Sequence, residues 1–341
     1  MKTLYSFLLS VFIVCSMTAS AQLSTKGTDF WLGFSENYLG ASVLKVFITS
    51  DVATTGVISV PQAGYTENFT VAANTTTMII MPFNTVNNTG SETVNNTGIH
   101  VLANAPVSVY ALNEQPFTSD ATGVLPTPAL GTVYTVAGAR DNSFRSQFLI
   151  VATEDNTIVT INPTVQTNAL RSANVPFDIT LQRGQSYQVQ SRVANSHLNG
   201  TTLTSTKPIA VFAGGRCTNI SGCAACDHIF EQNMPTNRLG QNFIIIPLAL
   251  RTVGTFYDVI ATENGTIVQR NGIVVATLNA RQTFSFSSTQ REVITSSAPI
   301  ALMQYSPGSD CDGVASDPFV VYVPPVDQMI DRIVFNAFVT P

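Results

Sequence analysis

The sequence predicts an all-β protein made of tandem, sandwich-like repeat units. Two observations support this prediction. In many short segments apolar and polar residues alternate at every second position, as in SYQVQS at residues 186–191, and this is the period of a half-buried strand. Related segments also recur about every hundred residues, which is the signature of a repeat architecture. No segment after residue 21 shows a sustained helical period, so a parallel α/β fold is not expected.

Three kinds of segment recur in the same order along the chain. The first is strand-like and ends in a polar turn: VFITSD from residue 46, FLIVATED from residue 148 and YDVIATEN from residue 257. The second places a proline before an alternating strand: ANAPVSVYAL from residue 103, STKPIAVFAG from residue 205 and SSAPIALMQY from residue 296. The third is LPTPALG from residue 125, MPTNRLG from residue 234 and VPPVDQ from residue 323. Because proline lacks an N–H, we place each proline of the second kind at the beginning of a strand.

These landmarks divide the chain into units that begin near Gly27, Gly131 and Gly240. The predicted division is a signal peptide at 1–21, β repeat units at 22–124, 125–233 and 234–322, and the start of a truncated fourth unit at 323–341. About six or seven short strands per unit suit a two-sheet sandwich. The alternative is a β-propeller in which each unit supplies two blades, which needs about eight strands per unit.

The N-terminus and the charge balance predict a secreted or cell-surface protein. Lys2, the apolar run LYSFLLSVFIVCSM and the small residues ASA at 19–21 form an export signal. No later segment is apolar enough to cross a bilayer. The net charge is −5, with 16 basic and 21 acidic residues and no basic run, which argues against a nucleic-acid partner. No cofactor motif is present in the sequence.

One stretch, CTNISGCAACDHIFEQNMP at 217–235, concentrates the reactive residue types. After the signal peptide the chain has four cysteines, Cys217, Cys223, Cys226 and Cys311. An even number in an exported chain predicts two disulfides, with three possible pairings. The rival is a zinc site made from Cys217, Cys223, Cys226 and His228. We favour disulfides, because structural zinc sites draw their ligands from two separated elements.

The same stretch gives no predicted catalytic residue. An oxidised cysteine cannot attack a substrate, and Cys226 and His228 are only two residues apart. We therefore expect Asp227, His228 and Glu231 to form hydrogen bonds within a stapled loop. Further along, DCDGVASD at 310–317 holds weak candidates for a calcium site, but the twelve-residue calcium-loop pattern is missing and a solvated turn is expected. These weak metal candidates are Asp310, Asp312 and Asp317.

The cysteine stretch and the strand before it resemble the IgGFc-binding protein N-terminal domain family. That family occurs in animal mucus proteins and in secreted or surface proteins of bacteria. The likeness extends from about Gly27 to the end of the chain, and its most specific part is the Cys-Asp-His-x-x-Glu-Gln core. The matching residues are Lys207, Pro208, Val211, Gly214, Cys217, Cys226, Asp227, His228, Glu231, Gln232, Pro235 and Gly240. Leu239 and Ser316 depart from the family pattern.

The resemblance implies binding rather than turnover. It implies a Cys217–Cys226 bridge, which leaves Cys223 and Cys311 to bridge each other. The leading hypothesis is a secreted or cell-surface, non-enzymatic binding or adhesion protein whose ligand is an extracellular protein or glycan. The alternative is a secreted carbohydrate-active or proteolytic enzyme fragment with a site split across repeats, and a third hypothesis is a structural spacer. The enzyme hypothesis requires a cleft in which two acids, or a base and a nucleophile, converge.

Overall fold

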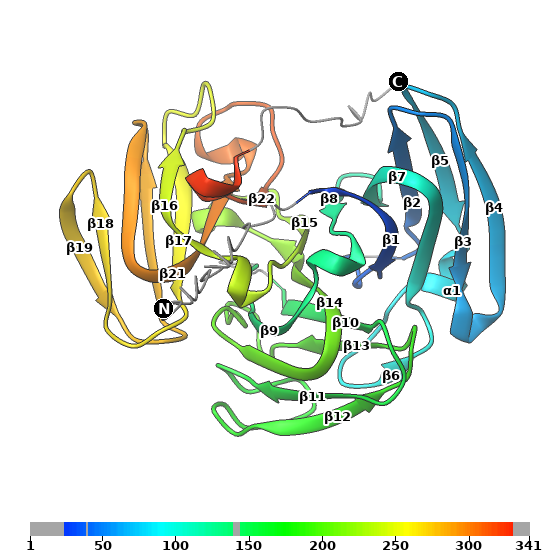
Figure 1. The fold of residues 1–341 in the computed structure, drawn as a ribbon. Helices are drawn as coiled ribbons and strands as arrows, with labels where there is room; N and C mark the ends of the chain where they lie inside the picture. Colours follow the sequence, from blue (N-terminus) through cyan, green and yellow to red (C-terminus); the bar gives the residue numbers. More distant parts are fainter. Residues whose placement is uncertain (1–23, 39, 139–143, 330–341) are drawn as a thin grey trace, which may run out of the picture.

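The computed structural model describes residues 24–38, 40–138 and 144–329. It confirms the all-β prediction: the described residues form three antiparallel sheets of seven, eight and seven strands (Figure 1). Within these residues the helical segments are the four-residue α1 (Phe83–Val86) and six short 3-10 turns. None of the described helices has the length and apolar character needed to span a membrane. The predicted signal peptide at 1–21 lies outside the described residues.

Apart from the short β6, each sheet takes its strands from one consecutive part of the chain, and we call these parts units 1, 2 and 3. The strands of unit 1 are β1 (Lys26–Leu32), β2 (Val43–Ser50), β3 (Thr54–Val60), β4 (Tyr65–Val71), β5 (Thr75–Met81), β7 (Ile99–Glu114) and β8 (Asp120–Val124). Those of unit 2 are β9 (Gly131–Thr135), β10 (Ser146–Ala152), β11 (Thr157–Asn162), β12 (Phe177–Leu181), β13 (Ser186–Gln190), β14 (Thr202–Thr218) and β15 (Asp227–Gln232). Those of unit 3 are β16 (Gly240–Ile245), β17 (Thr255–Ala261), β18 (Thr266–Arg270), β19 (Ile273–Leu278), β20 (Thr283–Ser288), β21 (Glu292–Ser306) and β22 (Phe319–Tyr322). The short β6 (Val94–Asn95) lies between β5 and β7 in sequence but pairs with β13 of unit 2.

Every unit is organised around one long strand that belongs to two half-sheets. The first half of β7 pairs with β1 and β3, and its second half pairs with β2 and β8. The strands β14 and β21 make the same set of four pairings in units 2 and 3. A long strand that bends from one half-sheet into another is a known way to make the corner of a β-sandwich. Each unit is therefore one connected sheet rather than the two separate blades of the propeller alternative.

The recurring prolines lie at the bends of these long strands. Pro106, Pro208 and Pro299 are interior residues of β7, β14 and β21, so the prediction that they begin strands was wrong. The strand continues through each proline because the pairing register shifts there, and a missing N–H costs nothing at such a bulge. Hydroxyl groups from the recurring polar turns support the bend: Thr153 and Thr262 donate to the carbonyls of Pro208 and Pro299, both at 2.6 Å.

A second proline closes each unit against its own first strand. Pro126, Pro235 and Pro325 follow the last strands of the three units and pack on Gly27, Gly131 and Gly240. A Cβ atom added to any of these glycines would overlap the Cβ of the opposing proline. The glycines that mark the repeat in the sequence are therefore required by a close approach of two backbone segments. We call Pro126, Pro235 and Pro325 the closing prolines.

The units are joined by apolar contacts between a half-sheet of one unit and the unit before it. Leu149, Val151 and Phe212 of unit 2 belong to the same buried cluster as Phe34 of unit 1. Ile260, Met303, Tyr305 and Val320 of unit 3 pack with Ala137, Ile220 and Ile229 of unit 2. Figure 1 shows unit 1 on the right, unit 3 on the left and unit 2 below and between them. Two of the buried apolar clusters therefore span the junctions between neighbouring units.

Replacing Gly131 with alanine is expected to lower the free energy of unfolding by about 1–3 kcal/mol, because the new methyl group overpacks against the closing Pro235. The matched control is Gly123→Ala, where the added Cβ would meet only Tyr110 at 3.9 Å and the change should stay within about 0.5 kcal/mol. Urea unfolding of both variants measures this. Equal midpoints for the two variants would contradict the closing role of the proline.

Candidate functional site

Cys217, Cys223, Cys226 and Cys311 form two disulfides. Cys217 pairs with Cys226, with their Cα atoms 5.0 Å apart, and Cys223 pairs with Cys311 at 5.3 Å. Both separations are normal for disulfides, and the expectation of disulfide bonds is confirmed. The first bond links the end of β14 to the start of β15, whereas the second ties unit 2 to the loop between β21 and β22 of unit 3. No cysteine thiolate remains among these four for zinc or for nucleophilic attack.

The motif that follows the cysteines forms strand β15, which is hydrogen-bonded to another strand along one edge only. Its other edge faces β8 of unit 1, and β15 also lies next to β22 of unit 3 near the centre of the molecule (Figure 1). Side chains of the β8 region accept the N–H groups of this second edge. The N–H groups of His228, Phe230 and Gln232 donate, in that order, to Thr118 Oγ1, Asp120 Oδ2 and Thr122 Oγ1, each at 2.9 Å. We call this set of contacts the side-chain ladder.

Glu231 extends the same arrangement from unit 2 to unit 3. Its Oε1 accepts the N–H of Tyr322 in β22 at 3.2 Å, and its Oε2 accepts the hydroxyl of Thr122 at 2.7 Å. The acceptors Thr122 and Glu231 occupy equivalent positions, each four residues before the closing proline of its unit. The donors Gln232 and Tyr322 are also equivalent, each three residues before the closing proline of its unit. The same contact is therefore made at the junction of units 1 and 2 and at the junction of units 2 and 3.

His228 is completely buried and held in one tautomer. Its Nδ1 donates to the carbonyl of Gly215 at 3.0 Å, so Nε2 carries no proton and accepts from the Asn113 amide at 3.4 Å. Burial, opposed only in part by the hydrogen bond to Gly215, lowers the pKa of His228 from 6.5 to about 4. The imidazole is therefore neutral at neutral pH, and it connects β14, β15 and the end of β7.

Three acids meet at this junction: Asp227 is buried, and Asp120 and Glu231 are half-buried. Burial raises the pKa of Asp227 and of Glu231 to about 7 and raises the pKa of Asp120 well above its usual value. Perturbed carboxyl groups of this kind often mark catalytic sites. Here, however, each acid accepts a backbone N–H: Asp120 from Phe230, Asp227 from His228, and Glu231 from Tyr322. The hydrogen bonds of Asp120 and Glu231 run between units, and that of Asp227 goes to the next residue, whereas the sequence led us to expect all of these bonds within one stapled loop.

The side-chain amide of Gln232 also connects unit 2 to unit 1. Its Oε1 accepts the N–H of Leu125 at 2.6 Å, just before the closing proline of unit 1. The neighbouring Asn233 makes two further bonds, accepting from the N–H of Ala137 and donating to its carbonyl, both at 2.8 Å. Three motif residues, His228, Glu231 and Gln232, thus hold strands together, and Asp227 accepts the N–H of His228.

The weak calcium candidates do not come together as ligands. Asp312 is paired with Arg251 at 3.0 Å, and both side chains are buried. Arg251 also donates to the carbonyls of Pro307 and Gly308, so it organises the loop from inside. Asp310 and Asp317 are exposed. Across residues 24–38, 40–138 and 144–329, no three or more His, Cys, Asp or Glu side chains are arranged to hold a metal ion.

One contact between an acid and a histidine was not predicted from the sequence. Nε2 of His100 lies 3.2 Å from Asp29 Oδ1, and the His100 ring stacks on Trp31 with ring centroids 4.0 Å apart. The pair forms because β1 and β7 lie side by side, although the two residues are 71 positions apart in sequence. Trp31 is buried, as expected for a core residue.

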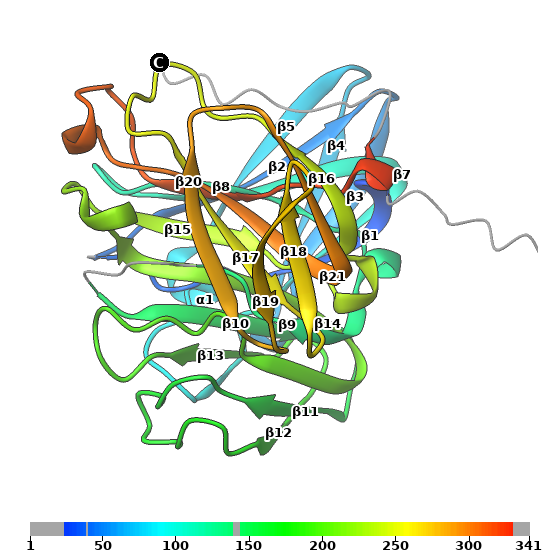
Figure 2. The ribbon, with the colours of Figure 1, turned by 90° about the vertical axis from the view of Figure 1, so that its left-hand side faces the viewer.

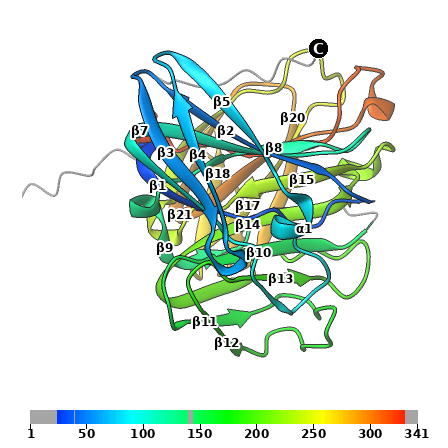
Figure 3. The same cartoon turned by 90° about the vertical axis from the view of Figure 1, so that its right-hand side faces the viewer.

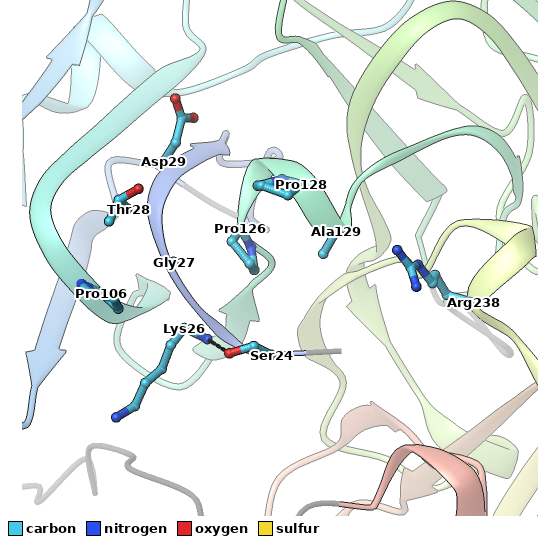
Figure 4. A pocket seen from close by; sticks show the side chains of 10 residues that line it. All are labelled: Ser24, Lys26, Gly27, Thr28, Asp29, Pro106, Pro126, Pro128, Ala129 and Arg238. Atoms are coloured by element: carbon cyan, nitrogen blue, oxygen red, sulfur yellow. Dashed lines mark hydrogen bonds between the residues drawn. The ribbon is translucent and has the colours of Figure 1, made fainter. Parts of the chain in front are cut away.

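Asp29 also lines a cavity of about 350 Å³ beside the closing segment of unit 1 (Figure 4). It is the one carboxylate in the lining, and it already accepts the Thr127 hydroxyl. Lys26 extends from the same strand in a different direction and pairs with Asp51 at 2.9 Å, while Arg238 lies across the opening. This cavity therefore brings no two acids together.

The raised pKa of Glu231 predicts a pH-dependent contribution to stability. The folded state holds the proton more tightly than the unfolded state, so this contribution is complete below about pH 4.5 and is lost as pH rises through about 7. Glu231→Gln cannot ionise but can still accept the Tyr322 N–H. Between about pH 5 and pH 8 the wild type should lose roughly 1–3 kcal/mol of stability relative to this variant. Urea unfolding at several pH values measures the difference.

The control for that experiment is Glu154→Gln, because Glu154 makes an exposed ion pair with Lys207. Its stability difference from wild type should change little over the same pH range. If the stability difference between Glu231→Gln and the wild type were equally independent of pH, it would contradict the raised pKa of Glu231.

Comparison with known proteins places the motif in a wider context. A family model described as IgGFc binding protein matches residues 120–340, which include every residue of the 217–240 motif region. The human IgGFc-binding protein is 28% identical over 229 residues, which are 64% of this chain and only 4% of the human protein. No solved structure matches the chain. The family match begins at residue 120, later than the Gly27 expected from sequence, and it covers most of the chain. The chain therefore belongs to the IgGFc binding protein family.

Proposed function

We propose that this chain is a secreted or cell-surface, non-enzymatic binding protein whose ligand is an extracellular protein. One observation carries the proposal: the polar groups of the family motif are used to join the units. The motif thus stabilises the assembly of units, and the ligand binds to the outer surface of that assembly. The name of the human relative refers to binding of an immunoglobulin Fc region, which supports a protein rather than a small molecule as the ligand.

The arrangement of acids favours binding over the alternative of a split enzyme site. Glycoside hydrolysis and proteolysis both need carboxylates or a base that substrate can reach. Asp120 and Asp227 are held by backbone N–H groups at a junction between units, and Glu231 bridges two further strands. The cavity beside Asp29 contributes a single carboxylate.

The outer half-sheet of unit 3 is the surface best suited to a protein ligand. It is formed by β16, the first half of β21, β18 and β19, and Figure 2 looks onto its last two strands. Ile244 and Val293 are directly opposed across β16 and β21 and are both exposed, as are Ile267 and Val274 on the next two strands. The residues between them on this face are uncharged: Asn242, Thr295, Ser297, Gln269 and Thr277.

This surface has the composition of an interface core, where charged residues are depleted. It carries no aromatic side chain among the residues just named, and flat aromatic platforms are typical of glycan sites. A protein ligand is therefore favoured over a glycan. The surface also lies within the residues that match the family model. Two disulfides and the apolar N-terminal sequence support export, because disulfides persist in oxidising compartments.

The test compares the wild-type chain with the double variant Ile244→Lys/Val293→Lys. Each protein is immobilised and exposed to purified immunoglobulin Fc and to defined mixtures of serum and mucus proteins, and bound proteins are identified and then titrated as purified components. The proposal predicts at least one saturable protein ligand whose affinity falls roughly tenfold or more in the variant. Val175→Lys, at an exposed valine of unit 2, is the matched control and should bind as wild type does.

Two results would overturn the proposal. One is the absence of any saturable protein ligand, or equal binding by the wild type and the double variant. The other is turnover of a peptide or glycan substrate by the wild type. Thermal unfolding of each variant verifies that the substitutions leave the fold intact.

A further inference from the structure

The cavity of about 350 Å³ beside Asp29 has a wall made largely of carbon. One side of it is β1, which pairs with β7 (Figure 3). The other side is lined by Pro106, Pro126, Pro128 and Ala129, and a proline offers ring carbons but no N–H. The volume lies within the range of about 300–1,000 Å³ that is typical of small-ligand sites. We call this space the unit 1 cavity.

The same short 3-10 turn follows the closing proline in all three units. These turns are η2 (Thr127–Ala129), η4 (Thr236–Arg238) and η6 (Val326–Gln328). In each of them the N–H of the last residue donates to the carbonyl of the closing proline, at 2.8 Å in unit 1 and 2.9 Å in units 2 and 3. Ala129, Arg238 and Gln328 therefore occupy equivalent positions, and only their side chains differ.

At the junction of units 2 and 3, this side chain connects two neighbouring turns. Nε2 of Gln328 donates to the carbonyl of Arg238, and the hollow that both residues line has a volume of only about 40 Å³. At the junction of units 1 and 2 the equivalent side chain is Arg238, which extends toward Ala129 (Figure 4). The unit 1 cavity remains open beside it.

The guanidinium of Arg238 is a cation without a counterion. It makes no hydrogen bond and no ion pair with any residue in the part of the chain that the structure describes. Lys26 differs in this respect, because its ammonium is paired with Asp51. The planar fork of guanidinium donors matches a carboxylate through two parallel hydrogen bonds. Arg238 therefore offers the unit 1 cavity a binding group for one carboxylate.

Asp29 limits the charge that a ligand in this cavity can carry. Its Oδ1 accepts the Thr127 hydroxyl and lies 3.2 Å from Nε2 of His100, while its Oδ2 makes no hydrogen bond with a described residue. Burial lowers the pKa of His100, so no imidazolium offsets the charge of Asp29 at neutral pH. A ligand with two negative charges would be repelled there, whereas a ligand N–H would find an acceptor.

We propose that the unit 1 cavity binds the C-terminal residue of a peptide whose last side chain is apolar. The terminal carboxylate pairs with Arg238, the apolar side chain packs on the proline wall, and a backbone N–H donates to Asp29. Figure 4 shows Pro126 and Pro128 between these two charged groups. An acidic sugar is less well suited, because no aromatic side chain lines the cavity. The site lies in units 1 and 2 and does not rest on the function proposed above for unit 3.

Calorimetric titration of the purified protein with short N-acetylated peptides tests the proposal. Peptides that end in leucine, valine or phenylalanine should bind saturably, and amidation of the C-terminus should weaken binding roughly tenfold or more, because the charged pair is lost. Arg238→Gln, which introduces the residue of unit 3, should bind the free acid no better than the amide. Arg192→Gln, at an exposed arginine of unit 2, is the matched control and should bind as wild type does.

Two further comparisons separate this site from its rivals. Ile244→Lys/Val293→Lys should leave peptide binding unchanged, because those residues lie on the half-sheet of unit 3. N-acetylneuraminic acid should bind more weakly than the leucine peptide. Thermal unfolding verifies that each variant keeps the fold.

The proposal would be overturned if none of the three peptide acids bound saturably at millimolar concentration. Equal affinity for acid and amide would also overturn it, as would an Arg238→Gln variant that keeps the preference for the acid. Tighter binding of N-acetylneuraminic acid than of the peptides would show a glycan site instead.

Discussion

The second edge of β15 is the constraint on which the assembly of units depends. A strand edge carries a row of N–H groups, and such groups are costly when they are buried without acceptors. Ordinary sheet pairing on both edges would satisfy them, but β15 pairs with β14 alone. Thr118, Asp120 and Thr122 provide the missing acceptors from the neighbouring unit. The units are therefore joined without merging their sheets, and an edge that would invite aggregation is covered.

This constraint explains why the family motif has a catalytic composition without a catalytic geometry. A buried junction needs acceptors, and carboxylates and hydroxyls are acceptors that a side chain can place opposite an N–H. Glu231 stands where unit 1 has Thr122 and makes the equivalent contact to the next unit. His228 connects Gly215 and Asn113 in its neutral form. The Cys223–Cys311 bond then fixes units 2 and 3 together outside the junction.

Local patterns predicted the strands well, because alternation and turn chemistry act over a few residues. The repeat also predicted which glycines matter, and Gly131 is explained by its contact with Pro235. The bend at Pro208 was misplaced because a strand that continues through a proline looks in sequence like a strand that begins there. The Asp120–Phe230 contact joins residues 110 positions apart, and no local pattern encodes such a distance. The alternation of Thr118, Asp120 and Thr122 was a usable signal of a polar strand edge.

Amide hydrogen exchange of β15, followed residue by residue, tests the central claim most directly. The side-chain ladder predicts that the N–H groups of His228, Phe230 and Gln232 exchange as slowly as those of β14, which is paired on both sides. It also predicts that Asp120→Ala accelerates exchange at Phe230 more than at the neighbouring residues that bond to β14. Rapid exchange of these three amides in the wild type, at the rate of an open sheet edge, would contradict the account.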